Sequence, residues 1–442
     1  MSKQPGVAGN VVRGSLGNLI EWYDWYAYSA FAVYFARSFF AEDDSSRLLE
    51  TFAVFSVGFL MRPIGGWFFG RFADRHGRRA ALTLSVLMMG AGSLIITFAP
   101  TYASIGIGAP VLLVLARLLQ GLSVGGEYGT SATYLSEVAT PSRRGFYSSF
   151  QYVTLIAGQL LALGLQIALQ QVLDEAQMSA WGWRIAFAVG AVGALTVLWL
   201  RRGMAESKPQ ATVDTLTDRR GRTLRDGSLA LLFRYPRAFF MVLGLTLGGT
   251  VAFYTYTTYM QQFMVNTVGF AKPDVAVVNF LALLVFIVLQ PLYGALSDRI
   301  GRKPLLVFFG IAGTLGTVPI LGTLAGTQSL LAAFALMLAA LVIVAGYTSI
   351  NAIVKAELFP SNVRALGVGL PYAIANAVFG GTAPTVALWL KRIGHESWFF
   401  WYVTACIAVS LLVYLFGFRN RAETHLDRDF GHAFARRPAP VE

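Results

Sequence analysis

The stretch GRFADRHGRR at residues 70–79 returns later in the chain as GALSDRIGRK at residues 294–303. The two copies share a glycine, an Asp-Arg pair and a closing basic pair at equal spacings, and roughly half of the 442 residues separate them. A second pattern, a Glu followed seven residues later by an Arg, occurs at 137–144 and again at 357–364. Two patterns repeated at nearly the same offset indicate that the chain consists of two similar halves.

The composition predicts that both halves lie in a membrane. Of the 442 residues, 55% are hydrophobic and only 13% are charged, whereas about a quarter of the residues of a soluble domain are charged. Five uncharged runs reach the ~20 residues that a helix needs to cross a bilayer. These runs are 145–173, 238–271, 275–297, 365–390 and 397–418.

Seven further spans follow from the remaining apolar sequence. Two runs, 80–116 and 304–354, are about twice the required length, and each contains a break that divides it into two helices. Three segments with isolated charges, near 14–38, 48–71 and 181–203, complete the set. The sequence therefore predicts an all-α membrane protein with twelve transmembrane helices in two pseudo-symmetric six-helix halves.

The basic residues lie on every second loop between these spans. They cluster at 71–79, 143–144, 201–237 and 299–303 and in the C-terminal tail, whereas the loop at 41–44 is acidic. Because Lys and Arg are retained on the cytoplasmic side of a membrane, we expect both termini to be cytoplasmic. The net charge of +12 then reflects anchoring of the loops at the lipid bilayer, and we expect no nucleic acid as a partner.

The repeats and loops divide the chain into four parts. They are an N-terminal half at 1–202, a linker at 203–236, a C-terminal half at 237–418 and a cytoplasmic tail at 419–442. The tail has no heptad pattern, so we expect it to lack fixed structure, and the first residues do not resemble a signal peptide. Cys406 is the single cysteine, which predicts no disulfide and no metal site. We expect a monomer that needs no cofactor.

Several motifs resemble those of a known transporter family. The loop motif in both halves and QGLSVGGEYG at 120–129 resemble the major facilitator superfamily, and GNLIEWYD at 17–24 and GFLMRPIGG at 58–66 are similar to its metabolite:proton symporters. The resemblance covers nearly the whole chain. It implies a symporter of the bacterial inner membrane that imports a small carboxylate with protons by alternating access. The first candidate substrate is the dicarboxylate α-ketoglutarate, and the alternatives are citrate, shikimate, betaine and proline.

Other functional classes fit the sequence less well. A proton-coupled efflux antiporter of this superfamily would have a Pro-rich fifth span, and residues 150–173 contain no Pro. A transporter-like sensor would need an additional cytoplasmic domain, for which the linker at 203–236 is too short. Neither a nucleotide-binding motif nor a nucleophile–base set indicates an enzyme. The energy for transport must then come from an ion gradient, with protons favoured by the resemblance and sodium left open.

Five ionisable side chains lie deep within the predicted spans, all of them in the N-terminal half. They are Glu21, Asp24, Arg62, Arg117 and Glu127. Because such a group costs about 2.5–3.5 kcal/mol at the centre of a membrane helix, it usually has a partner and a function. In the C-terminal half, Lys355 and Glu357 are expected near a cytoplasmic helix end, so we predict that this half brings no charge deep into the membrane.

Asp24 and Arg117 are the expected proton-coupling pair. Proton-coupled sugar porters have an acid on helix 1 that faces an arginine on helix 4, and these two residues occupy the similar positions. An aspartate can exchange a proton while an arginine stays charged. Glu21 and Glu127 are the alternative carriers. The competing interpretation is a permanent ion pair that only holds helices 1 and 4 together.

Arg62 is the first candidate for binding the substrate, because it lies inside the second span without a neutralising neighbour in the sequence. A guanidinium group can bind a carboxylate through two parallel hydrogen bonds. Arg117 is the second candidate, and an ion pair with Glu127 is the alternative role for Arg62. Polar side chains elsewhere would orient the ligand. The candidates are Gln151, Tyr152, Tyr254, Tyr259 and Asn376.

The repeated loops are expected to form a cytoplasmic gate. Asp74 is placed to cap the start of a helix and to contact cations such as Arg78 and Arg144, and these contacts would break when the gate opens. The mirror-image set consists of Asp298, Arg302 and Arg364.

Overall fold

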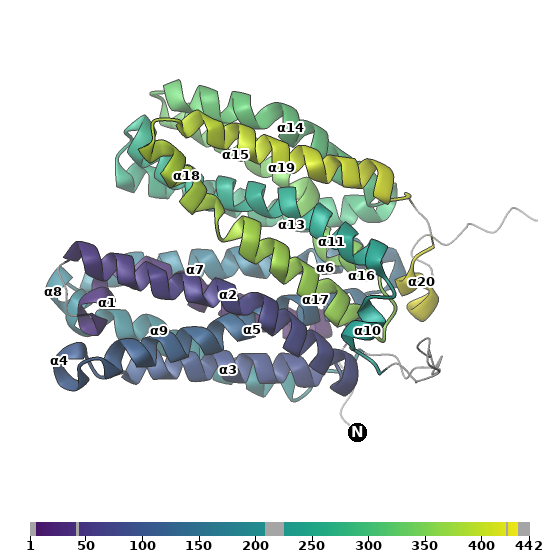
Figure 1. Cartoon of the computed structure of the whole chain (residues 1–442), viewed down its shortest axis with the longest axis horizontal. Coiled ribbons are helices and arrows are strands. Elements are labelled where there is room, and N and C mark those ends of the chain that lie inside the picture. The colour runs from purple at the N-terminus through teal and green to yellow at the C-terminus, as the bar shows by residue number, and fades with distance from the viewer. Residues whose placement is uncertain (1–5, 41–43, 208–224, 421–422, 432–442) are drawn as a thin grey trace, which may run out of the picture.

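The computed structural model describes residues 6–40, 44–207, 225–420 and 423–431. Regular structure in this part of the chain is helical. Figure 1 shows two bundles of long helices side by side, the first in purple and blue and the second in green and yellow. Each of the twelve predicted spans corresponds to a long helical segment, which confirms the fold class.

The first half contains six long segments joined by short helices. The long segments are α1 (Val7–Phe39), α2 (Asp44–His76), α3 (Arg78–Phe98), α5 (Gly108–Val138), α6 with α7 (Arg144–Ser148, Phe150–Val172) and α9 (Trp183–Arg201). The short helices α4 (Tyr102–Ile105) and α8 (Glu175–Gln177) lie at one end of the bundle, which we call the far end. The opposite end, where α10 (Leu229–Leu232) and α20 (His425–Phe430) lie in Figure 1, is called the linker end.

The second half repeats this arrangement with more interruptions. Its segments are α11 (Pro236–Tyr254) continued by α12 (Met260–Phe263), α13 (Lys272–Ile300), α14 (Lys303–Gly326), α15 with α16 (Leu330–Thr348, Asn351–Ala356), α17 with α18 (Arg364–Ala375, Ala383–Arg392) and α19 (Glu396–Gly417). The short α10 (Leu229–Leu232) precedes it. A π-helical turn at Asn376–Gly380 separates α17 from α18, and such turns are frequent at functional sites.

Nine segments of the described chain are long and apolar enough to cross a membrane. The other three predicted spans are α1, α2 and the α17–α18 segment. These three hold Asp24, Arg62 and Asn376, which are all buried within the protein. Polar groups also reach the interior from the more apolar segments, since Arg117 and Glu127 on α5 are buried as well.

Glycines bring α2 and α5 into backbone contact. A Cβ atom on Gly121 would lie 2.5 Å from the Gly58 carbonyl oxygen, and one on Gly125 would collide with the backbone of Arg62. Small residues at such positions let membrane helices approach closely. We call the contact of Gly58, Gly65, Gly121 and Gly125 the glycine seam. It fixes the position of α2 against α5 and thereby the point from which the Arg62 side chain projects.

The prediction of an unstructured tail is wrong for residues 424–431. Thr424 caps the short helix α20: its hydroxyl accepts a hydrogen bond from the Asp427 amide at 3.2 Å, and the Asp427 carboxylate accepts one from the Thr424 amide at 3.0 Å. This reciprocal capping box stabilises the start of a helix without any heptad pattern. The side chains of Leu426 and Asp427 are buried against the linker end of the bundle.

Candidate functional site

Arg62 projects from α2 into the interface between the two halves. Its Nη1 donates hydrogen bonds to Asn376 Oδ1 at 2.8 Å and to the Tyr254 hydroxyl at 3.3 Å, both in the second half. The side chain is buried, and its Nε and Nη2 have no hydrogen-bond partner among the described residues. One edge of the guanidinium is thus still available for a bidentate contact with a carboxylate.

Aromatic rings surround this guanidinium and link it to a second one. The guanidinium carbon of Arg62 lies 4.1 Å from the centre of the Phe59 ring and 4.3 Å from that of Trp25. Arg117 lies 4.3 Å from the same Trp25 ring and 4.2 Å from the Tyr28 ring. Such cation–π contacts stabilise buried cations. Trp25, next to Asp24 in the sequence, therefore contacts both arginines.

Asp24 and Arg117 are joined through a third residue. The Gln120 side-chain amide donates to the Asp24 carboxylate, while its oxygen accepts a hydrogen bond from Arg117 Nη1 at 2.8 Å. Asp24 is fully buried, and its Oδ1 has no hydrogen-bond partner in the part of the chain described. The structure thus brings the expected pair together around a bridging amide, which can reorient when the carboxylate changes its protonation state.

The two alternative proton carriers are held by other partners. Glu127 forms an ion pair with Arg201 at 2.7 Å, so the pair between Arg62 and Glu127 does not form in this structure. Glu21 accepts a hydrogen bond from Ser123. Arg201 is fully buried, although its position in the basic run at 201–237 suggests a loop residue that anchors the chain at the lipid surface. For Arg201, that expectation is wrong.

The remaining substrate candidates are distributed over three places. Tyr254 and Asn376 lie at Arg62, and the buried Tyr152 packs edge-on against Phe253 at 5.4 Å, next to Tyr254 in the sequence. Gln151 donates to Asn18 at 3.0 Å within the first half. Tyr259 donates to Glu396 at 2.7 Å, apart from the arginine site.

A buried lysine changes the description of the second half. Lys355 is fully buried, and its Nζ donates to the Tyr128 hydroxyl of the first half at 2.9 Å. It also donates to Asn351 Oδ1 at 3.1 Å. That the second half brings no charge deep into the membrane stays a prediction, but Lys355 is enclosed at the interface between the two halves.

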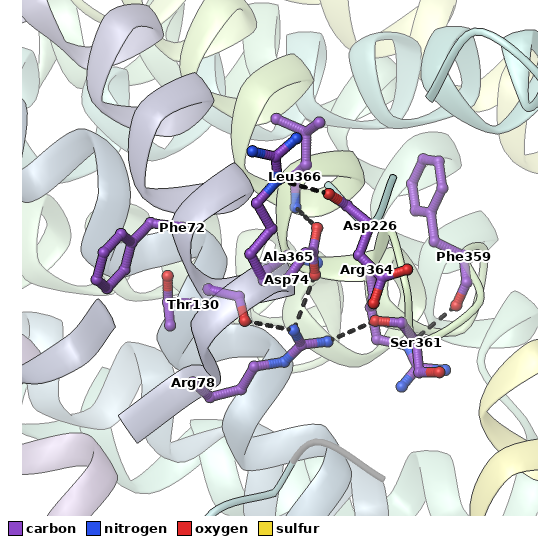
Figure 2. A network of polar contacts seen from close by, with 12 residues as sticks. Phe72, Asp74, Arg78, Thr130, Asp226, Phe359, Ser361, Arg364, Ala365 and Leu366 are labelled. Atoms are coloured by element: carbon purple, nitrogen blue, oxygen red, sulfur yellow. Dashed lines mark hydrogen bonds and ion pairs between the residues drawn. The ribbon is translucent and has the colours of Figure 1, made fainter. Parts of the chain in front are cut away.

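Two aspartates of the loop motif cap helices of the opposite half. Figure 2 shows Asp74, whose carboxylate accepts hydrogen bonds from the amides of Ala365 and Leu366, each at 3.0 Å, at the start of α17. In the mirror-image contact, the Asp298 carboxylate accepts from the amides of Gly145 and Phe146 at 2.8 and 2.9 Å, at the start of α6. These carboxylates meet the positive end of a helix and close the linker end.

Each aspartate also pairs with the arginine of its own motif. Arg78 lies 2.8 Å from Asp74, and Arg302 lies 2.8 Å from Asp298. Arg78 donates in addition to the Ser361 carbonyl of the second half at 2.8 Å, as Figure 2 shows. Of the residues expected to form a gate, Asp74, Arg78 and Asp298 are therefore in contact with the opposite half.

The two glutamates of the repeat differ in their partners. Glu137 is shared by Arg78 at 3.1 Å and by Arg364 of the other half at 2.8 Å. Glu357 contacts Arg302 at 3.3 Å. Burial raises the pKa of the Glu357 carboxyl above its usual 4.5, and the Arg302 guanidinium limits this rise.

The tail helix binds the arginines that follow these glutamates. Arg144 forms an ion pair with Asp427 at 2.7 Å rather than with Asp74, and it donates to the Gly431 carbonyl at 3.0 Å. Arg364 forms an ion pair with Asp429. One short segment thus contacts both halves. We call residues 424–431 the tail clip.

Comparison with known proteins decides the family. A model of the Major Facilitator Superfamily matches residues 14–370. The chain belongs to this superfamily. It is 55% identical over 407 residues to the alpha-ketoglutarate permease of Escherichia coli K12, covering 92% of each chain, and 34% identical to a citrate-proton symporter of Klebsiella pneumoniae, covering 86% of this chain and 84% of that one.

Solved structures agree with this Major Facilitator Superfamily fold. The proton:xylose symporter XylE bound to 6-bromo-6-deoxy-D-glucose superposes with a TM-score of 0.73 at 18% identity, covering 92% of this chain and 94% of that one. A partially occluded inward open form of the xylose transporter XylE from E. coli gives 0.65 at 18% identity, over 92% and 96% of the two chains. The family match and the 55% identity to a permease make the chain a multi-pass membrane transporter and not an enzyme.

Three buried polar residues of the candidate site were missed or misplaced by sequence reasoning. Gln120 carries no charge, and its position on the same helix face as Arg117 is the signal that could have drawn attention to it. Arg201 and Lys355 lie close to the ends of predicted spans, where cations usually reach the lipid surface. Their burial depends on partners from distant helices, which spacing within one helix does not reveal.

Proposed function

We propose that this chain is a proton-coupled symporter that imports α-ketoglutarate across the bacterial inner membrane. The observation that carries the proposal is Arg62, a buried guanidinium with one free edge between the halves, held by Tyr254 and Asn376. An anionic carboxylate complements this site in charge and in shape. The similarity to an alpha-ketoglutarate permease over 92% of the chain supports the same substrate class.

We assign the linker end to the cytoplasm, together with both termini. The clusters of Lys and Arg near residues 71–79 and 299–303 support this orientation. With this assignment, the capping contacts of Asp74 and Asp298 seal the cytoplasmic side. The substrate would then reach Arg62 from the periplasm, and release into the cytoplasm would require these contacts to break.

Asp24 is proposed to carry the proton. Its carboxylate lies beside the amide of Gln120, which also holds Arg117. Binding of a proton neutralises Asp24, so Arg117 no longer has a negative charge beside it. Trp25 transmits this change to Arg62, because its ring contacts both Arg117 and Arg62. Proton binding and substrate binding are in this way coupled through one indole ring on α1.

Uptake into proteoliposomes tests the proposal. Labelled α-ketoglutarate should accumulate when the outside is made acidic, and a protonophore should abolish the accumulation. Replacing sodium by choline should leave uptake unchanged. Accumulation of citrate, shikimate or betaine in place of α-ketoglutarate would overturn the substrate, and uptake that follows sodium would overturn the coupling ion.

Two variants test the assigned residues. Asp24→Asn should abolish accumulation against a gradient while exchange of internal for external substrate continues, and Asp174→Asn, at an exposed position of the far end, is the matched control. Arg62→Lys should lower the affinity by roughly tenfold or more, because a lysine cannot replace a bidentate contact. Wild-type accumulation by the first variant would refute the carrier role of Asp24.

A further inference from the structure

Lys355 lies in a cage of neutral groups. Besides the Tyr128 hydroxyl and Asn351, its Nζ lies 4.1 Å from the centre of the Tyr372 ring, 4.9 Å from that of Tyr128 and 5.9 Å from that of Tyr347. No ion pair joins it to an acidic side chain in the described part of the chain. The ammonium group is thus buried without a counter-ion.

The burial of the Lys355 ammonium group requires a physical explanation. A buried charge without a partner of opposite sign is costly, and hydrogen bonds and aromatic rings offset only part of this cost. An ammonium group has three N–H donors, and the two hydrogen bonds of Lys355 leave one of them unused. Both partners are neutral oxygens, which a carboxylate would replace with a stronger, charge-assisted hydrogen bond.

A single aromatic residue separates Lys355 from the substrate arginine. Asn376 accepts a hydrogen bond from Arg62 at 2.8 Å and donates one to the Tyr372 hydroxyl at 3.0 Å. The face of the same Tyr372 ring lies against Lys355. Two buried cations, one from each half of the protein, are therefore connected through the neutral side chains of Asn376 and Tyr372.

We infer that Lys355 binds the second carboxylate of a dicarboxylate substrate whose first carboxylate is bound by Arg62. The inference rests on the proposed function and specifies how that site selects its ligand. The carboxylate beside the keto group binds the guanidinium, where Tyr254 and Asn376 can orient the keto oxygen. The remote carboxylate binds the ammonium group.

This arrangement also connects binding to gating. The Tyr128 hydroxyl contacts both Asn351 and Lys355, and the Tyr128 ring stacks on Tyr372 with 3.5 Å between the ring centres. These contacts hold the first half against the second. A carboxylate that binds the Lys355 ammonium group displaces the Tyr128 hydroxyl from it and weakens the contact between the halves. A dicarboxylate therefore favours opening of the linker end, and a monocarboxylate does not.

The test compares two ligands on three proteins. The ligands are α-ketoglutarate and its monomethyl ester at the remote carboxylate, which adds only one methyl group and removes one charge. Their affinities are measured by calorimetry on the wild type, on Lys355→Met and on Lys272→Met, an exposed control. The wild type should prefer the diacid by roughly 10- to 100-fold. Lys355→Met should bind the diacid as weakly as the monoester, with the affinity for the monoester unchanged.

The outcomes separate the inference from the proposed function. Equal affinity of the wild type for both ligands would overturn the role of Lys355 without the need for any variant, and so would a diacid preference that survives in Lys355→Met. Lys355→Arg keeps the charge and should retain part of the preference, which distinguishes lost charge from lost folding. If the wild type does not transport α-ketoglutarate in proteoliposomes, the proposed function itself fails.

Discussion

The two copies of the repeated loop cap helices in the same way but differ in their ion pairs. Asp74 and Asp298 each accept two backbone hydrogen bonds from the opposite half at 2.8–3.0 Å. In the first copy, Glu137 is fully enclosed and receives an arginine from each half. In the second copy, the Glu357 side chain is 12% exposed and pairs with Arg302 of its own half.

The tail clip explains this difference. By the symmetry of the repeat, Arg144 should cross to Glu357 as Arg364 crosses to Glu137. Arg144 instead pairs with Asp427 of the tail. Duplication has thus preserved the backbone caps, whose geometry depends on the fold, while one of the two cross-half ion pairs has been replaced by a contact with the tail.

The largest expected effect distinguishes the two glutamates. Glu137→Gln leaves the buried Arg78 and Arg364 without a shared counter-ion, and breaking a buried ion pair costs about 3–5 kcal/mol. Glu357→Gln removes a single ion pair within one half and should cost less, about 1.5 kcal/mol. Unfolding of the purified protein by denaturant measures both. Equal losses would show that the two copies are energetically alike.

The two aspartates should give equal and intermediate effects. Asp74→Asn and Asp298→Asn each keep an acceptor for the two amides and lose only its charge, so the loss should be about 2–3 kcal/mol in total. Hydrogen exchange should therefore accelerate by a similar factor at Ala365 and Leu366 in one variant and at Gly145 and Phe146 in the other. A much larger factor at one copy would contradict the equivalence of the caps.

Removal of the tail clip should have a smaller effect. A chain that stops after Asn420 loses the contacts of Asp427 and Asp429, and we expect the linker end to open about fivefold more often, or about 1 kcal/mol. Exchange at Gly145 and Phe146 reports this opening. A chain that stops after Gly431 keeps the clip and is the control. Identical exchange in the two truncations would show that the clip does not hold the gate.

The smallest effect is a dependence of the tail clip on pH. Burial lowers the pKa of His425 below its usual 6.5, with the cations Arg428 and Arg364 acting in the same direction. A group with a lowered pKa stabilises the docked form above its undocked pKa, and this contribution is lost as the pH falls. After correction for the intrinsic pH dependence of amide exchange, protection at residues 424–431 should therefore fall by a few fold below about pH 6, and His425→Phe should abolish this loss. Protection that increases on acidification would contradict the sign.

The repeat, together with the apolar runs, was sufficient to predict the fold, whereas the gating role of the loop residues stays a prediction. The two motifs locate Asp74 and Asp298 correctly, but their partners are backbone amides of the opposite half, which no side-chain pattern reveals. Arg201 resembles an anchor because it begins a basic run, and only its contact with Glu127 shows otherwise. The tail clip did carry a readable signal, since Thr424 and Asp427 form a capping box three residues apart.

The glycine seam has a consequence for interpreting binding data. Because α2 and α5 touch through their backbones at the glycine seam, Arg62 and Arg117 keep a fixed separation while the halves move. A methyl group added at Gly121 would force the helices apart and shift the Arg62 guanidinium away from Tyr254. Substitutions of these glycines would then change substrate affinity as strongly as substitutions of residues that touch the substrate.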